Sequence, residues 1–135
     1  MRTWGVLLAV ALVACATAER PRNAPAERLA ADKASRVPAG EPVECLPVAQ
    51  IRETRVLDDQ TIDFFLRDGR VFRSELPQRC PQLGFERSFG YNTSIPQLCR
   101  VDLITVIQTT GGPQTGATCG LGPFTPLKPA GNARG

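Results

Sequence analysis

The sequence has no histidine among its 135 residues, and its aromatic residues are few: six Phe, one Tyr and one Trp. Without an imidazole base, neither a Ser–His nor a Cys–His nucleophilic mechanism can be assembled. Zinc sites usually combine closely spaced cysteines with histidine, and the cysteines here are never separated by two residues. We therefore predict no metal, no cofactor and no enzyme of these classes.

The centre of the chain also has no excess of positive or negative charge. Residues 45–127 contain eight Arg and eight acidic residues, although the whole chain has a net charge of +3. No basic stripe with interleaved aromatic residues is present, as a nucleic-acid interface would require. The excess positive charge belongs to the two ends, so we predict no nucleic-acid partner.

Long apolar runs are absent, because the longest, residues 4–13, is too short for a membrane-spanning helix. With Arg2 before it, this run is typical of an export leader over residues 1–18. Leu12-Val13-Ala14-Cys15 resembles a bacterial lipobox, in which Cys15 is acylated and anchors the protein to a membrane. Cleavage after Ala18, giving a soluble exported protein, is the alternative.

The four remaining cysteines, at positions 45, 80, 99 and 119, form an even set. In an exported protein such a set predicts two disulfides. The sequence thus places the protein in the periplasm or at the outer membrane, an oxidising environment in which two crosslinks would stabilise a small core.

The clearest structural signal is a β-hairpin over residues 61–76 around Asp68-Gly69. A three-residue loop with Gly69 in the left-handed conformation pairs Phe64 with Phe72 and Asp63 with Arg73. A two-residue loop would instead set charged residues opposite apolar ones. We therefore choose the first register, whose apolar face has these members: Ile62, Phe64, Leu66, Phe72 and Leu76.

Further strands are expected over residues 51–57, 101–107 and 117–124, with a short helix or 3₁₀ turn between residues 80 and 99. Residues 19–44 are rich in Ala and Pro and predict a flexible linker, with an ordered helix as the alternative. Residues 45–127 form the folded domain, and residues 128–135 a frayed tail.

These elements predict a mainly β fold, a small antiparallel meander or partly open barrel of four to five strands. In an up-and-down meander, Cys80 leaves one strand at the end where Cys99 enters the next. Cys45 and Cys119 then lie near the opposite end. We therefore expect Cys80–Cys99 and Cys45–Cys119, one of three possible pairings.

Several motifs, in this order, carry a resemblance: Cys45, Arg55-Val56-x-Asp58-Asp59-x-Thr61-Ile62, Asp68-Gly69-x-Val71-Phe72-Arg73, Leu76, Cys80-Pro81-x-Leu83, Leu98-Cys99-x-x-Asp102-x-Ile104-x-Val106 and Cys119-x-Leu121-Gly122-x-Phe124. Together they resemble an uncharacterised family of proteobacterial cell-envelope proteins with a domain of unknown function. The likeness covers residues 45–126. It implies an exported, often lipid-anchored domain, and it supplies no assigned activity and no catalytic residue.

Two groups of residues are candidates for chemistry. Asp58, Asp59 and Asp63 would be a cation site or an acid–base pair, but a turn with an Asp63–Arg73 pair explains them better. Asp102 lies within an apolar strand, where it is a buried base with a raised pKa, is exposed on an edge, or is the partner of a neighbouring arginine such as Arg100 or Arg55. We prefer the arginine pair.

The aromatic residues Phe65, Phe85, Phe89 and Tyr91 form a partner-binding patch or cover the second face of the sheet; we prefer the second interpretation. The favoured function is a non-enzymatic binding or structural module of the bacterial envelope, acting on an envelope protein or ligand. A secreted inhibitor-like accessory module is the alternative, and a small carboxylate-dependent hydrolase is less favoured.

Overall fold

The computed structural model describes residues 24–131, so the predicted leader with Cys15 and the last four residues lie outside the described part. Within that part the fold is mainly β, as predicted, and its antiparallel sheets are not closed into a barrel. No helix of residues 24–131 combines the length and the apolarity needed to cross a bilayer.

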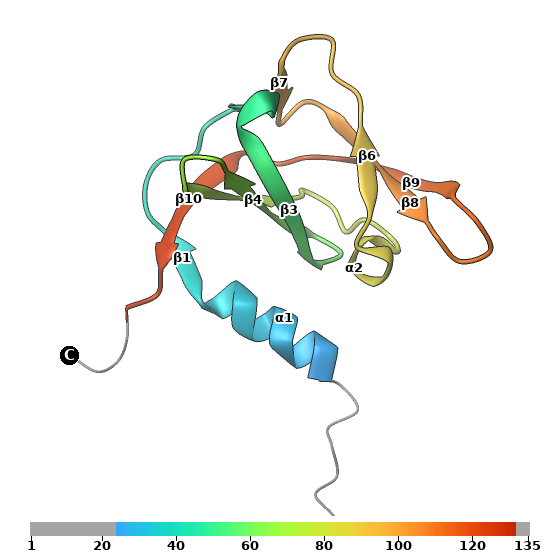
Figure 1. Ribbon diagram of the computed structural model, residues 1–135, viewed down its shortest axis with the longest axis horizontal. Helices are drawn as coiled ribbons and strands as arrows, with labels where there is room; N and C mark the ends of the chain where they lie inside the picture. Colours follow the sequence, from blue (N-terminus) through green and yellow to red (C-terminus); the bar gives the residue numbers. More distant parts are fainter. Residues whose placement is uncertain (1–23, 132–135) are drawn as a thin grey trace, which may run out of the picture.

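The strands of the described part form three sheets (Figure 1). The main sheet has the order β1-β10-β5-β4-β3 and contains β1 (Arg36–Pro38), β3 (Ile51–Asp58), β4 (Thr61–Leu66), β5 (Val71–Glu75) and β10 (Phe124–Pro129). A second sheet pairs β2 (Cys45–Pro47) with β7 (Gln97–Cys99). The third has the order β6-β8-β9 and contains β6 (Phe89–Tyr91), β8 (Leu103–Gln108) and β9 (Gln114–Gly120). The helical segments are α1 (Ala24–Ala34), the 3₁₀ turn η1 (Val48–Gln50) and α2 (Leu83–Glu86).

The β4–β5 hairpin has the predicted three-residue register. Phe64 lies opposite Phe72 and Asp63 lies opposite Arg73. Gly69 adopts φ +90°, a left-handed conformation that a side chain disfavours. All five residues of the predicted apolar face are buried. The hairpin register therefore follows from local sequence alone.

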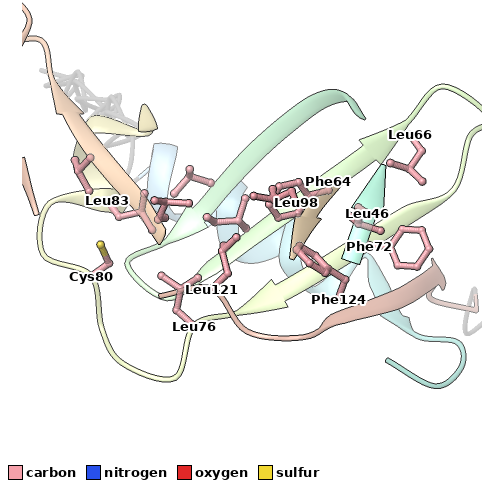
Figure 2. Close-up of a cluster of buried hydrophobic side chains, with 14 residues drawn as sticks. Leu46, Phe64, Leu66, Phe72, Leu76, Cys80, Leu83, Leu98, Leu121 and Phe124 are labelled. Carbon is pink, nitrogen blue, oxygen red and sulfur yellow. The ribbon is translucent and has the colours of Figure 1, made fainter. Parts of the chain in front are cut away.

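A single apolar cluster joins the three sheets (Figure 2). The main sheet contributes Phe64 and Phe124, whose rings meet edge to face at 5.3 Å between centroids. Leu46 and Leu98 enter the cluster from the two-stranded sheet, and other members come from the three-stranded sheet and the connections. Its buried members are Leu46, Val56, Ile62, Phe64, Leu66, Phe72, Leu76, Cys80, Leu83, Leu98, Ile104, Val106, Leu121 and Phe124.

The predicted number of disulfides is confirmed, but the predicted pairing is wrong. The bonds are Cys45–Cys99 and Cys80–Cys119. The meander ends after β5, and β7 pairs with β2, which places Cys45 directly opposite Cys99. Cys80, in the connection after β5, then meets Cys119 on β9 of the third sheet.

The structure differs from the flexible linker predicted for residues 19–44. In the described part of this segment, α1 forms a helix and β1 pairs with β10. The same pairing orders Lys128 and Pro129, the first residues of the predicted tail. Backbone pairing and ion pairs with distant residues hold α1, β1 and the start of the predicted tail in place. The amino-acid composition of these segments indicates neither kind of contact.

The remaining strands shift from their expected positions. β3 and the short helix α2 are confirmed, and β8 begins two residues later than predicted. The predicted last strand divides into β9 and β10, because residues 121–123 lie between two different sheets. The three-residue strands β6 and β7 were not predicted, since so short a segment carries no readable period.

Candidate functional site

A groove of about 1160 Å³ lies between α1 and the body of the domain. Leu29 and Lys33 line it from α1, and Phe85 lines it from α2. Its base is formed by the β3–β4 turn and by the end of β5. Figure 1 shows α1 running along one side of the body, with α2 near the N-terminal end of α1. The groove thus exposes apolar and charged side chains together.

Phe85 is the most exposed of the aromatic residues that the sequence singles out. Its side chain is 75% exposed, while Leu83, two residues earlier, is fully buried and fixes α2 to the core. Phe89 and Tyr91 are half-buried on β6 and pack against the apolar cluster. The structure therefore does not gather the three aromatic residues into one exposed patch. Phe65 covers the second face of the main sheet, at 7% exposure.

The charged side chains of the groove differ in their pairing. Lys33 is paired with Asp58, and Arg79 is paired with Asp59. Arg87 makes no ion pair within residues 24–131, and it also lines an adjoining hollow of about 700 Å³ between α1 and β3. This guanidinium is available to an anionic group of a ligand.

The three clustered acids have local structural partners. Asp58 accepts the Gln60 N–H at 2.8 Å and the Lys33 ammonium at 3.0 Å. Partial burial raises the pKa of Asp58, but the hydrogen bonds from Lys33 and Gln60 prevail and hold it below its usual range. Asp63 is paired with Arg73, as predicted. Asp59 accepts the N–H of Gly84 at 2.7 Å and so holds α2 against the turn.

Asp102 lies in a bend before β8, not inside the strand, and neither predicted arginine pairs with it. Its carboxylate accepts the Cys99 N–H at 2.7 Å, so it stabilises the turn between β7 and β8. Arg100 is paired instead with Glu44. The open hollow beside Asp102, of about 480 Å³, is lined by no second carboxylate. The geometry therefore gives no support to acid–base chemistry there.

Helix α1 is held against the main sheet by polar contacts. Asp32 accepts hydrogen bonds from Arg55 at 2.8 Å and from Arg36 at 3.3 Å. Both guanidinium groups also lie 5.0 Å from the centroid of the Phe65 ring. The buried Arg73 donates to the carbonyl oxygen of Lys33 at 3.2 Å, in the last turn of the helix. These contacts fix the position of the wall that α1 gives to the groove.

Comparison with known proteins identifies one family. Residues 1–121 match a family of unknown function (DUF6491). The chain belongs to this family. Neither curated proteins nor solved structures give a match. Within residues 24–131, no group of three or more Cys, Asp or Glu side chains is placed to hold a metal ion.

Sequence reasoning missed most of the residues that build the groove in this DUF6491 protein. Leu29 and Lys33 lie in a segment that reads as a linker, and Arg79 and Arg87 lie between the hairpin and the next expected strand, where the sequence has no clear period. Nothing in the local sequence indicates that these residues meet. Phe85 carried a signal, because it is one of only six phenylalanines in the chain.

Proposed function

We propose that this protein is exported to the bacterial envelope, is tethered to a membrane through Cys15, and acts there as a non-enzymatic binding module. The lipobox-like sequence before Cys15 supports the tether. The two disulfides support export, because such bonds persist in oxidising compartments. The groove beside α1 is the proposed binding site, and the exposure of Phe85 is the observation that carries it.

The ligand that fits the groove is an extended segment of another envelope protein. An apolar side chain of this segment would pack on Phe85 and Leu29, and a neighbouring Asp or Glu would meet Arg87. An exposed aromatic ring beside an unpaired arginine is a common arrangement at protein interfaces, where aromatic residues and Arg are enriched. A single polypeptide segment that carries an apolar side chain next to an Asp or Glu would contact Phe85 and Arg87 together.

An inhibitor-like accessory module is the second candidate. Phe85 projects from a short helix that is fixed by Leu83, so its ring is suited to insertion into a pocket of a partner. A carboxylate-dependent hydrolase is not supported, since Asp102 has its own backbone partner and no carboxylate neighbour in the hollow.

Intact-mass measurement of the protein purified from its native host tests export and tethering. We expect a mature chain that begins at an acylated Cys15 and gains about four hydrogens on reduction, two for each disulfide. An unprocessed chain would contradict export. A chain that begins after Ala18 would contradict the tether and leave the groove as the site of a soluble protein.

Selection of random peptides on the mature protein tests the groove. We expect enriched peptides to carry a large apolar residue next to Asp or Glu. Their affinity should fall roughly tenfold in Phe85→Ala and in Arg87→Glu, as expected when a central interface residue is lost. Val101→Ala is the matched control, because Val101 is 79% exposed and lies outside the groove. Peptides that bind Phe85→Ala as well as the wild type would refute this site.

A further inference from the structure

Strand β3 forms one edge of the main sheet, because it pairs with β4 on one side only. In an antiparallel sheet, the backbone N–H and C=O groups of successive residues point alternately to the two sides of the strand. The Leu66 N–H donates to the Arg70 carbonyl oxygen, so Leu66 and every second residue before it in β4 face β5. Asp63 therefore faces β3, where it lies opposite Arg55.

The free edge of β3 consequently carries the backbone groups of Thr54 and Val56, the residues on either side of Arg55. Within residues 24–131, no other backbone group pairs with them. Shifts in the β3–β4 register interrupt the strand before and after this stretch, which limits the regular edge to residues 53–56. A short piece of sheet edge is thus available for pairing.

The hollow of about 700 Å³ between α1 and β3 opens on to this edge. Thr54, Arg55 and Val56 all line it. The Val56 side chain packs in the apolar cluster, whereas Arg55 points to the opposite face of the sheet, towards Asp32 of α1. A hollow that contacts residues of both faces lies at the edge between them. Thr54 is exposed there, and Val56, at 3% exposure, lies at the more enclosed end.

The hollow continues into the groove that carries Phe85, since Leu29 and Arg87 line both. Figure 1 shows β3 running towards α2, and Asp58 at the end of β3 lines the groove. Because a strand rises about 3.3 Å per residue, Thr54 lies about 13 Å along β3 from Asp58. An extended segment laid along the edge of β3 therefore reaches the groove within about four residues.

We propose that the partner segment binds by strand addition: it pairs as a further strand with residues 53–56 of β3 and continues to Phe85 and Arg87. Strand addition rests on the proposed function of the groove and adds the mode of binding. Backbone pairing at the edge gives affinity with little dependence on sequence, while the groove selects the apolar and acidic side chains. Helix α1 stays in place as the outer wall, so Leu29 remains part of the site.

N-methylation of the selected peptides tests the backbone pairing. Each peptide is remade with one backbone N–H methylated at a time, which removes one donor and leaves the side chains unchanged. On one side of the apolar–acidic pair, we expect the affinity to fall about five- to tenfold at alternate positions, because only every second N–H faces β3. The positions in between are the matched control. Absence of this alternation would overturn strand addition, while Phe85→Ala would still decide whether the groove binds at all.

Hydrogen exchange in the full mature chain reports the same pairing from the protein side. Without peptide, the Thr54 amide should exchange much faster than the Arg55 amide, which faces β4. A saturating selected peptide should slow the exchange of Thr54 roughly tenfold. Unchanged exchange of Thr54 in the complex would overturn strand addition. Protection that appears without peptide and grows with protein concentration would also overturn it, because the edge would then bind a second copy of the chain.

Thr54→Pro removes an N–H that faces the edge without removing a hydrogen bond to β4, a position at which an edge strand tolerates proline. We expect the affinity for the selected peptides to fall several-fold. Thr118→Pro on β9 is the matched control: the Leu121 N–H donates to the Asp102 carbonyl oxygen, so the Thr118 N–H likewise faces away from β8. A folded Thr54→Pro variant with the affinity of the wild type would contradict strand addition. If this variant does not fold, the N-methylated peptides decide the question.

Discussion

Replacing Cys80 and Cys119 by Ala should lower the free energy of unfolding by about 4 kcal/mol. The bond closes a loop with a sequence separation of 39 and so restricts the unfolded chain. Removing the bond returns the lost conformational entropy to the unfolded chain and thereby stabilises it. Cys80 is fully buried in the apolar cluster, so the change also removes sulfur atoms from the core. Since a domain of this size has a stability of about 5–15 kcal/mol, much of it would be lost. Urea unfolding of both proteins, followed by circular dichroism, measures the difference.

The second disulfide provides an internal comparison. Cys45–Cys99 spans 54 positions, and the same entropic relation again gives about 4 kcal/mol. Its two cysteines are half-buried, whereas Cys80 is fully buried, so Cys45–Cys99 should be reduced first by a limiting amount of thiol. Peptide mapping of the partly reduced protein reports the order. If removing either bond left the stability unchanged, the core would not need the crosslinks.

The hairpin could be predicted because everything that sets its register lies within 16 residues. The Asp-Gly turn fixes the loop, and the alternation of apolar residues decides which register buries them. The disulfide pairing could not be predicted in the same way. It depends on the pairing of β2 with β7, two strands far apart in the chain. It also depends on β8 joining β6 and β9 in a separate sheet instead of continuing the main sheet.

The candidate site was less predictable, because no feature of the sequence distinguishes its charged residues from the other charged residues of the surface. Asp102 appears buried in an apolar strand only if β8 begins at Val101, but a bend precedes the strand. Asp32 has no local feature that distinguishes it, and its role arises from Arg55 on a strand 23 positions away. Charge pairs across elements depend on the fold, whereas apolar periodicity shows in the sequence before the fold is known.

Asp63→Ala should lower the free energy of unfolding by about 3–5 kcal/mol, the largest effect expected for a single substitution here. Asp63 is fully buried, and its two oxygens accept from Arg73 at 2.7 and 2.9 Å. Removal of the carboxylate leaves the guanidinium of the buried residue Arg73, which is 8% exposed, with no compensating charge. Among residues 24–131, its one remaining acceptor is the carbonyl oxygen of Lys33 at 3.2 Å. Denaturant unfolding at neutral pH measures the loss.

A double variant shows whether the loss comes from the unpaired charge or from the missing pair. Because a buried ion pair costs desolvation energy, Asp63→Leu with Arg73→Met should be more stable than Asp63→Ala alone, despite the second change. The exposed Asp68–Arg70 pair of the same hairpin is the control, and Asp68→Asn should cause no measurable change. A double variant less stable than Asp63→Ala would mean that the pair itself, with its bidentate geometry, stabilises the sheet more than apolar packing could.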